Sequence, residues 1–548
     1  MKFFTAAKAK FPSLQSSLSA VSSAILLALA FPGFEFWFLA FFALVPLFWA
    51  IERESPSIVK SFLLGWLWGT VFFFGTCWWL AYAPTHYGGM PAVVSYFLVL
   101  CATAAVGIFP AMFALLFSVL RGRFGVYAVL AAPFLWTAIE FLRFWTTGNN
   151  WNAIGYSQAF NDGIVKNASI GGVFLVGFLV VSANVYIFLL LAGGAFSFRK
   201  ALLNHERAKS YFLQPPSHKI IFLFTIIFAL SYAASFFAPR ESETVSKPFE
   251  PKPQSTFVVA VQPNVPMSGL KYEDWQRLRG KHVELTENAL RNLPRTDNQP
   301  PAIVIFPESP MNFQYERDRE FQQFLRELTT RNNVGILFNA AEPDADRSSY
   351  FNSAVMVNEK GEKTAQYDKI FLLPFGEYAP VPAPLQNLVP TMVGNFSFGS
   401  EYDLLPFGAA RGGVMICFES HFPNLAREYA LAGADVLIEM TNDGYLGNTP
   451  VLRQHLANAV FRAVETRRPL LRVTNVGITA YIDERGEVLD AAEPYTPATR
   501  IWTIAKSDGK PTFYVRYGDW FAWLCSLVSL ILILFGARRK LAKDENKA

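Results

Sequence analysis

Apolar blocks long enough to cross a membrane flank the middle of this 548-residue chain, and they constrain its fold more than any other feature. They fill residues 20–240 and return at 519–536, whereas a mixed apolar and polar region covers about 255–505. A helix needs about 20 apolar residues to span the hydrocarbon core of a bilayer. Because 52% of the chain is hydrophobic and only 17% is charged, membrane spans must account for much of the sequence.

We predict about eight membrane-spanning helices. They lie near residues 18–31, 35–51, 61–83, 91–120, 125–145, 170–195, 219–238 and 519–536. These spans divide the chain into four parts. The parts are an N-terminal membrane domain with about seven helices (1–238), a linker (239–255), an α/β domain (256–505), and a final span with a basic tail (506–548).

The short loops that carry Lys and Arg alternate along the membrane domain, which predicts its orientation. Positive charges near span ends are retained in the cytoplasm. They precede the first span and follow the second, fourth, sixth and eighth, whereas loops 83–91 and 148–170 carry Lys166 alone. Both termini are therefore predicted to be cytoplasmic, and the α/β domain, which follows seven spans, is predicted to be extracytoplasmic. The net charge of +5 reflects this topology, and no basic, aromatic-interleaved patch indicates nucleic-acid binding.

Strand-like and helix-like segments alternate in the region between the linker and the last span. We predict strands near 256–262, 302–306, 334–339, 353–358, 412–416, 436–440 and 470–474. We predict helices near 275–293, 321–330 and 424–432. This alternation is typical of a layered α/β domain whose reactive groups gather along one edge of its sheet.

Cys417 ends the apolar run 413–416, at a strand end where α/β enzymes often present a nucleophile. The other cysteines, Cys77, Cys101 and Cys525, lie in hydrophobic segments and are read as small apolar residues. A thiol needs a base or a cationic neighbour to be a good nucleophile at neutral pH.

Glu308 and Lys369 are the candidates for activating this thiol. Glu308 follows the strand-like run 302–306, where a carboxylate is either functional or a cap for the next segment. Lys369 lies between a charged and an apolar stretch, and taken alone this position favours a surface lysine with a buried stem.

Motifs around these three residues resemble those of the apolipoprotein N-acyltransferase family, a bacterial membrane-bound branch of the nitrilase (carbon-nitrogen hydrolase) superfamily. They are Phe306-Pro307-Glu308-Ser309, Tyr367-Asp368-Lys369, Leu373 to Pro380, Ile416-Cys417-Phe418-Glu419, Thr441-Asn442-Asp443-Gly444, Gln454-His455, Arg462 to Glu465, Arg468 to Arg472 and Thr474 to Gly477. The resemblance covers nearly the whole chain. It implies a multi-span α-helical membrane domain joined to an extracytoplasmic nitrilase-like domain, which is an αββα sandwich.

The resemblance also implies roles for individual residues. Cys417 would be the nucleophile, Glu308 the general base and Lys369 the oxyanion stabiliser, with the backbone N–H of Phe418 as a second oxyanion donor.

Four further residues are implied to support catalysis or to contact substrate. Glu377 would orient the lysine, and Glu419 would support the loop beside the nucleophile. Tyr378 and Trp151 are candidates for contact with substrate. A departure from the family pattern is Tyr445-Leu446, where related sequences often show aromatic pairs.

The implied reaction is a ping-pong acyl transfer. A phospholipid donates a fatty acyl chain to Cys417 as a thioester, and the α-amino group of the diacylglyceryl-cysteine at the N-terminus of an apolipoprotein accepts it. No cofactor is implied, and the six histidines form no ligand cluster at zinc spacing. We expect a monomer in the bacterial inner membrane.

Three other interpretations stay open at this stage. A membrane-tethered nitrilase-type amidase would use the same residues on small amides. A cysteine-histidine hydrolase would pair Cys417 with His421 or His455. A transport or binding protein would need charges within its spans, yet Glu140 and Arg143 lie near a span end.

Overall fold

The computed structural model describes residues 11–55, 57–202, 255–268, 271–293, 300–308, 314–345, 349–379 and 396–545. The chain divides into two compact units. The helical unit comprises Met1–Ala81, Ala92–Arg240 and Asp519–Ala548, and the sheet unit comprises Tyr82–Pro91 and Glu241–Gly518. The span predicted at 219–238, and all but the last residue of the predicted linker, lie outside the described residues.

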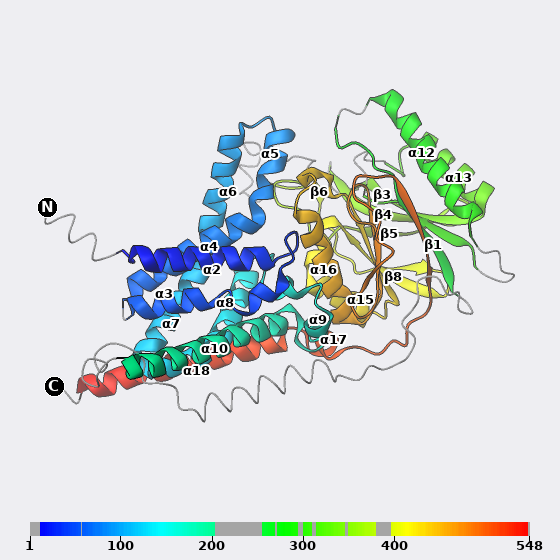
Figure 1. The fold of residues 1–548 in the computed structure, drawn as a ribbon. Helices are drawn as coiled ribbons and strands as arrows, with labels where there is room; N and C mark the ends of the chain where they lie inside the picture. Colours follow the sequence, from blue (N-terminus) through cyan, green and yellow to red (C-terminus); the bar gives the residue numbers. More distant parts are fainter. Residues whose placement is uncertain are drawn as a thin grey trace. The chain divides into compact units, whose positions relative to one another are not determined.

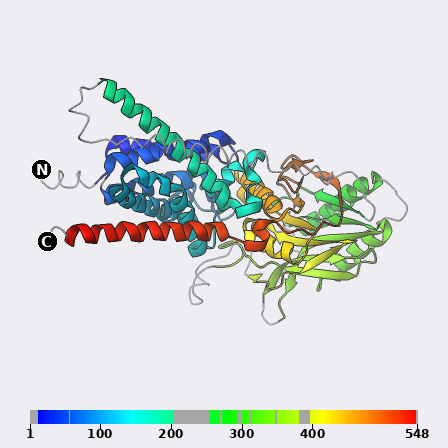
Figure 2. The ribbon, with the colours of Figure 1, turned by 90° about the horizontal axis from the view of Figure 1, so that it is seen from below.

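The helical unit consists of helices with short connections (Figures 1 and 2). Its elements are α2 (Leu14–Ala30), η1 (Trp37–Phe41), α3 (Val45–Glu54), α4 (Ile58–Cys77), η2 (Trp78–Ala81), α6 (Ala92–Val106), α7 (Ile108–Phe124), η3 (Gly125–Ala131), α8 (Ala132–Thr147), η4 (Ile154–Gln158), α9 (Asp162–Val165), α10 (Ala168–Leu202) and α18 (Trp520–Glu545).

Four helical segments in the described part of the chain are long and apolar enough to cross a membrane. They are Ile58–His86, Ala92–Phe124, Tyr127–Thr147 and Ala168–Ala192, and two shorter apolar helices are Leu14–Ala30 and Trp520–Gly536. The segment predicted as one span at 35–51 is instead divided into η1 and α3. Pro46 lies in the first turn of α3. Because proline lacks a backbone N–H, it favours the start of a new helix over the continuation of an earlier one.

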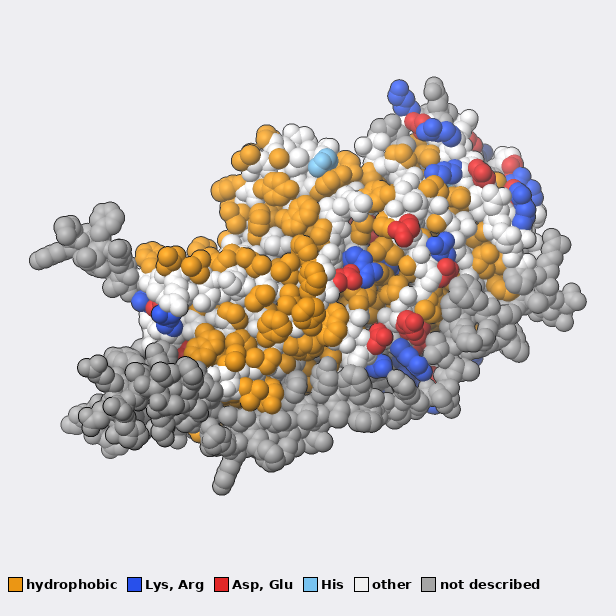
Figure 3. All heavy atoms as spheres, viewed as in Figure 1, with side chains coloured by type: hydrophobic (Ala, Val, Ile, Leu, Met, Phe, Trp, Pro, Cys, Tyr) orange, Lys and Arg blue, Asp and Glu red, His pale blue; other side chains and the backbone are white. Residues whose placement is uncertain are grey.

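Hydrophobic side chains cover much of the visible face of the helical unit (Figure 3). Val93 and Phe97 on α6 are 82% and 60% exposed, and Leu530 and Leu534 on α18 are more than half exposed. Soluble proteins seldom expose apolar patches of this extent. The surface composition therefore agrees with helices that contact lipid.

The sheet unit contains thirteen described strands and the helices that cover them. The strands are β1 (Thr256–Gln262), β2 (Ala302–Ile305), β3 (Val334–Pro343), β4 (Tyr350–Val357), β5 (Lys363–Asp368), β6 (Phe396–Ser397), β7 (Leu404–Phe407), β8 (Ala410–Ile416), β9 (Val436–Thr441), β10 (Leu470–Thr474), β11 (Ala480–Ile482), β12 (Val488–Leu489) and β13 (Ala498–Ile504). The helices are α5 (Tyr82–His86), α12 (Tyr272–Arg291), α13 (Arg319–Asn332), η6 (Cys417–His421), α15 (Pro423–Leu431), η7 (Asp443–Leu446), α16 (Val451–Thr466) and α17 (Phe513–Tyr517).

These strands form two sheets. One has the order β13-β1-β2-β3-β4-β5, with β6 beside β4, and the other has the order β12-β11-β10-β9-β8-β7. Contacts of β1 with β10 and of β4 with β8 show that the sheets face each other. Helices α12 and α13 cover the outer face of the first sheet, and α15 and α16 cover the second (Figure 1). This arrangement confirms the predicted αββα sandwich.

Buried apolar strands at the centre of each sheet explain its rigidity. All seven residues of β1 are buried, and β9 and β10 are buried throughout. On α13, Phe321, Leu325 and Leu328 recur on one face and enter the core beneath the first sheet. The ends of β2 and β8 are therefore fixed, and the residues that follow them are held in defined positions.

Candidate active site

Cys417 follows the last residue of β8 and adopts a left-handed backbone conformation with φ of +53°. Residues other than glycine rarely adopt this conformation, and the strain costs about 1–3 kcal/mol. The chain turns at once into η6, and the cysteine remains partly accessible, unlike Cys77 and Cys525, which are buried. This sharp turn presents the Sγ atom at the end of the strand.

Glu419 connects the turn after β8 with the loop after β5. Its fully buried carboxylate accepts hydrogen bonds from the backbone N–H of Ile416 (2.8 Å) and from those of Ile370 (2.7 Å) and Phe371 (3.0 Å). The hydroxyl of Tyr367 donates a fourth bond at 2.7 Å. Because Lys369 lies between Tyr367 and Ile370, Glu419 fixes the lysine loop against the nucleophile turn.

Lys369 points into the site and is only 1% exposed. Its Nζ donates to both carboxylate oxygens of Glu377, at 3.0 and 2.8 Å, and lies 3.9 Å from Oε1 of Glu308. Glu377 is itself held by the backbone N–H of Leu373 at 2.7 Å. Burial alone would lower the pKa of Lys369, but the charges of Glu377 and Glu308 outweigh it and raise that pKa. The lysine is therefore a permanent buried cation.

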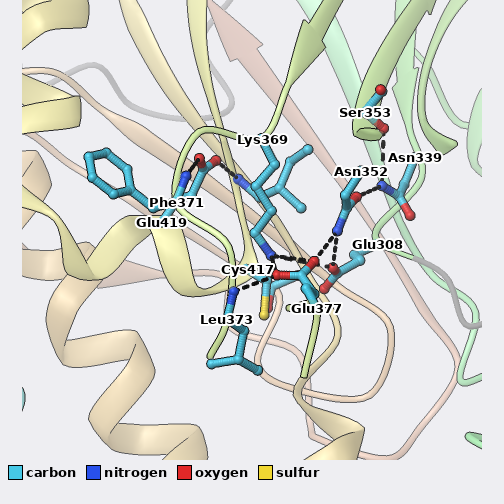
Figure 4. Close-up of polar contacts among 12 residues, drawn as sticks. Glu308, Asn339, Asn352, Ser353, Lys369, Phe371, Leu373, Glu377, Cys417 and Glu419 are labelled. Atoms are coloured by element: carbon cyan, nitrogen blue, oxygen red, sulfur yellow. Dashed lines mark hydrogen bonds and ion pairs between the residues drawn. The ribbon is translucent and has the colours of Figure 1, made fainter. Parts of the chain in front are cut away.

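Asn352, on β4, joins the two carboxylates of the site (Figure 4). Its Nδ2 donates to Oε1 of Glu308 at 3.0 Å and to Oε1 of Glu377 at 2.6 Å. Its Oδ1 accepts from Nδ2 of Asn339 at 2.7 Å, which orients the amide. Asn352 thus holds the two carboxylates at fixed positions on one side of the lysine.

The predicted trio of Glu308, Lys369 and Cys417 comes together in this structure (Figure 4). The thiol of Cys417 is hydrogen-bonded to Glu308. Burial and the Glu308 charge raise the pKa of the Cys417 thiol well above its usual range, so the resting group is a thiol. Burial also raises the pKa of Glu308, against the opposing effect of Lys369, and this makes the carboxylate a stronger base. The arrangement can deprotonate a thiol and stabilise an oxyanion.

A buried ionic network lies behind the nucleophile turn. Glu439 is fully buried, and both Glu439 and Asp443 pair with Arg472. The imidazole of His455 contacts Asp443 through Nδ1 at 2.8 Å and Glu439 through Nε2 at 2.9 Å. Burial disfavours the charged imidazole, but Glu439 and Asp443 raise the pKa of His455 to about 9. Because this histidine is protonated at neutral pH, it cannot act as a general base for Cys417.

The remaining predicted residues have less direct relations to the nucleophile. Tyr378 follows Glu377, and its ring packs edge-on against Phe398 with centroids 5.1 Å apart. The ring of Phe418 stacks on His421. Trp151 belongs to the helical unit, where its ring packs against Trp79. Substrate contact by Tyr378 and Trp151, and oxyanion binding by the Phe418 N–H, stay predictions.

Sequence reasoning missed two parts of this site. Asn352 lies at the start of a segment predicted only as extended chain, and nothing in its immediate sequence marks it as functional. Asp443, His455 and Arg472 lie in the motifs 441–444, 454–455 and 468–472, and Glu439 lies in the segment 436–440, which is predicted only as a strand. A linear sequence does not show that these charges meet. Among the described residues, no group of three or more His, Cys, Asp or Glu could hold a metal ion.

Comparison with known proteins finds two matching families along the chain. The family model described as "Apolipoprotein N-acyltransferase N-terminal domain" matches residues 23–186, and that described as "Carbon-nitrogen hydrolase" matches residues 258–512. The second match includes all three of Glu308, Lys369 and Cys417.

Similar proteins extend over nearly the full length. Apolipoprotein N-acyltransferase of Geobacter metallireducens is 32% identical over 531 residues, with 95% of each chain covered. The protein of the same name from Thermotoga maritima is 30% identical and covers 98% of this chain and 97% of its own. Relatives that combine both halves of the chain under one acyltransferase name do not favour a small-amide amidase or a transport protein.

Among solved structures, a Saccharomyces cerevisiae protein of branch 10 of the nitrilase superfamily is 19% identical, with a TM-score of 0.36. It covers 46% of this chain and 90% of its own. The six- and seven-stranded sheets and the carbon-nitrogen hydrolase match show the fold of the sheet unit.

Proposed function

This chain belongs to the apolipoprotein N-acyltransferase family, and on that premise we propose how its active site works. The enzyme transfers a fatty acyl chain to apolipoproteins in bacterial lipoprotein maturation. Its acyl donor is a membrane phospholipid, and its acceptor is the α-amino group of an N-terminal diacylglyceryl-cysteine. The acyl chain is carried between them as a thioester on Cys417.

In the first half-reaction, the Glu308 carboxylate takes the thiol proton while Sγ of Cys417 attacks the ester carbonyl carbon of the phospholipid. The resulting oxyanion is stabilised by the Lys369 ammonium and the Phe418 N–H. When the tetrahedral intermediate collapses, the ester C–O bond breaks and Glu308 returns the proton to the leaving oxygen. Lysophospholipid departs and the acyl group remains on sulfur.

In the second half-reaction, the amine of the diacylglyceryl-cysteine attacks the thioester carbonyl carbon. Glu308 takes a proton from the attacking nitrogen, and the same two donors stabilise the second oxyanion. The C–S bond then breaks, the sulfur recovers a proton and an amide is released. An amide is more stable than a thioester, so this sequence needs no nucleotide.

The observation that carries this proposal is the juxtaposition of Glu308, Lys369 and Cys417. Cys417, with its strained backbone, is hydrogen-bonded to Glu308, and Lys369 lies 3.9 Å from that carboxylate. Glu377 holds the lysine, and Asn352 holds the carboxylates of Glu308 and Glu377. Strained backbone positions of this kind cluster at active sites. Several membrane-spanning-capable helices in the same chain suit an enzyme whose two substrates are both anchored in a bilayer.

The orientation of the enzyme follows from its charge distribution. We propose that it resides in the bacterial inner membrane as a monomer, with both termini in the cytoplasm and the sheet unit on the periplasmic side. The alternation of Lys and Arg between short loops supports this topology.

The test uses the full chain in detergent micelles with a phospholipid whose acyl chains are isotopically labelled and a synthetic diacylglyceryl-cysteine peptide. We expect the peptide to gain one labelled acyl group. Cys417→Ala, Glu308→Gln and Lys369→Ala should each lower the rate by roughly 10³-fold or more, whereas Cys101→Ala, a change of an exposed cysteine in the helical unit, should not. Transfer that survives Cys417→Ala would overturn the proposal.

A further inference from the structure

We propose that His455 is a positioning residue, which aims the Phe418 N–H at the oxyanion by holding the carbonyl oxygen of Cys417. This inference rests on the proposed function, because that function assigns the Phe418 N–H as an oxyanion donor. It gives a task to a buried ionic network that the acyl-transfer steps do not use.

The contacts of the imidazole show that both of its nitrogens donate. Nδ1 lies 2.8 Å from the carboxylate of Asp443, and Nε2 lies 2.9 Å from that of Glu439. An ionised carboxylate only accepts hydrogen bonds, so each ring nitrogen must carry a hydrogen. Nε2 is also 3.1 Å from the carbonyl oxygen of Cys417, and it therefore presents its N–H to that oxygen as well. The nucleophile's own backbone thus accepts a hydrogen bond from a buried cation.

That carbonyl and the Phe418 N–H belong to the same peptide group. A trans peptide is planar, and its C=O and N–H bonds point in opposite directions. A donor that fixes the oxygen of Cys417 on one side therefore fixes the direction of the Phe418 N–H on the other. A charged donor at the oxygen also polarises the peptide group, which makes its N–H a stronger donor.

The direction of the Phe418 N–H depends on this contact. Rotation of the peptide between residues 417 and 418 changes ψ of Cys417 and φ of Phe418, and it would turn that N–H away from the oxyanion while Cys417 keeps its φ of +53°. The hydroxyl of Ser420 also approaches the Cys417 oxygen, but at 3.5 Å and without charge. The charged contact from His455 opposes the rotation most strongly.

The histidine is itself held rigidly by groups on three other elements. Glu439 on β9 accepts from the Ser420 hydroxyl at 2.7 Å and pairs with Arg472 on β10. Asp443 in η7 accepts from Arg472 at 2.7 Å. The imidazole on α16 therefore cannot turn away without breaking two buried ion pairs. Its contacts with Glu439, Asp443 and the Cys417 carbonyl oxygen connect it to the backbone of the turn, so its effect on the reaction passes through the peptide.

Two variants separate the donor from the rest of the side chain. In His455→Gln, the amide nitrogen can occupy the place of Nε2 and still donate to the Cys417 oxygen. In His455→Asn, the shorter amide matches Nδ1 and cannot reach it. Ser420→Ala is a comparison, because it removes the longer neutral contact to the same oxygen and one donor to Glu439 but leaves the charged imidazole in place. Melting temperatures establish that each full-length variant is folded at the assay temperature.

Two reagents then report on different requirements of the site. Iodoacetamide alkylates Cys417 by displacement at a saturated carbon, which needs the thiolate but no oxyanion donor. p-Nitrophenyl butyrate acylates Cys417 through a tetrahedral intermediate, and this reaction needs both the thiolate and the oxyanion donor. We expect His455→Asn to lower acylation by about 10- to 100-fold, less than full loss of an oxyanion donor, and to change alkylation by less than about twofold. His455→Gln should recover most of the acylation rate, and Ser420→Ala should lower acylation less than His455→Asn does.

Equal losses of acylation and alkylation in His455→Asn would overturn the inference, because a merely structural role would move the thiol itself. Wild-type acylation in His455→Asn would overturn it as well. If that variant fails to fold, Asp443→Asn takes its place. It keeps the imidazole but weakens its anchor at Nδ1, and the same selective loss of acylation is expected. Butyryl transfer from the activated ester tests His455 even if phospholipid proves not to be the donor, so the two proposals fail separately.

Discussion

At the scale of single residues, Glu308 is the proposed general base, and its protonation state would control the proposed chemistry. Burial raises its pKa above the ordinary glutamate value of about 4.3. A base must be ionised to accept the thiol proton, so acylation should be fully active above this raised pKa and lost as pH falls through it. We predict that the acid limb of the pH profile of acyl-enzyme formation lies above pH 4.3, measured by single-turnover kinetics with phospholipid.

Glu308→Gln is the control for this limb. The amide has nearly the same shape but no titrating proton, so the residual rate should be low and flat across the acid range. An unchanged limb in that variant would assign the titration to another group.

The titration of His455 should make the stability of the folded protein fall as pH rises, whereas the titration of Glu308 should make the acylation rate rise with pH. The pKa of His455 is about 9 in the folded protein and about 6.5 when unfolded, so the folded state binds the extra proton between these values. The stabilisation is complete below about pH 6.5 and is lost as pH rises to 9. It amounts to roughly 3 kcal/mol. We predict that the melting temperature falls over this interval by more in the wild type than in His455→Gln, and equal slopes would contradict this assignment.

The sequence could predict Cys417 and Glu308 because each directly follows a strand-like apolar run, which defines where its side chain emerges. Lys369 was identified by its motif, since a lysine after a polar strand has no distinctive periodicity. Asn352 could not be predicted, because its role depends on two carboxylates that come from loops 44 residues before and 25 residues after it. The contact of Asn352 with these two carboxylates can be recognised only in the folded sheet, where the strands are paired.

At the scale of elements, Glu419 joins the turn of η6 to the loop after β5. Burial raises its pKa to about 7, but four donors converge on its two oxygens and favour the ionised form. In Glu419→Gln, an amide NH₂ must replace one acceptor and face a backbone N–H. We predict a destabilisation of roughly 3 kcal/mol, measured by denaturant or thermal unfolding.

Tyr367→Phe is the matched comparison for this junction. It removes one of the four donors and keeps the carboxylate, so the expected cost is about 1 kcal/mol. A cost in Tyr367→Phe equal to that in Glu419→Gln would show that the backbone bonds of Glu419 contribute little.

The buried central strands with continuous apolar runs were the most predictable elements. The apolar runs of β1, β8, β9 and β10 stand out from their surroundings, and the predicted segments match them within two residues. Strands β5, β6, β7, β11, β12 and β13 were not predicted. Four of them, β6, β7, β11 and β12, have two to four residues and show no clear alternation. Helix α16 was missed because it is buried nearly all round, which removes the polar face that marks an amphipathic helix.

At the scale of the whole molecule, residues 82–91 are part of the sheet unit although helices flank them in sequence. The hydroxyl of Tyr87 donates to the Gly444 carbonyl at 3.2 Å, and its ring packs on Tyr445, with centroids 6.1 Å apart. Burial, and then the charge of Glu308, raise the pKa of Tyr445, which places this contact close to the reacting groups. The segment therefore forms part of the wall beside the active site.

Gly447 provides a test of this packing. Its φ of 69° and ψ of −177° suit glycine alone, and an added Cβ would lie 2.5 Å from the Tyr82 ring. We predict that Gly447→Ala destabilises the protein by roughly 3 kcal/mol, of which the ring clash is a part. In a Tyr82→Ala background the same change should cost less, because only the backbone strain remains. Strictly additive effects in this double-mutant cycle would show that residues 82–91 do not pack here.

The most direct test of the central claim is the mass of the intact full-length chain after incubation with phospholipid. We predict a gain of one fatty acyl group that hydroxylamine removes, and this gain should be present in Cys101→Ala and absent in Cys417→Ala. An adduct that persists in Cys417→Ala, or release of lysophospholipid without any adduct in Glu308→Gln or the wild type, would contradict a thioester on Cys417.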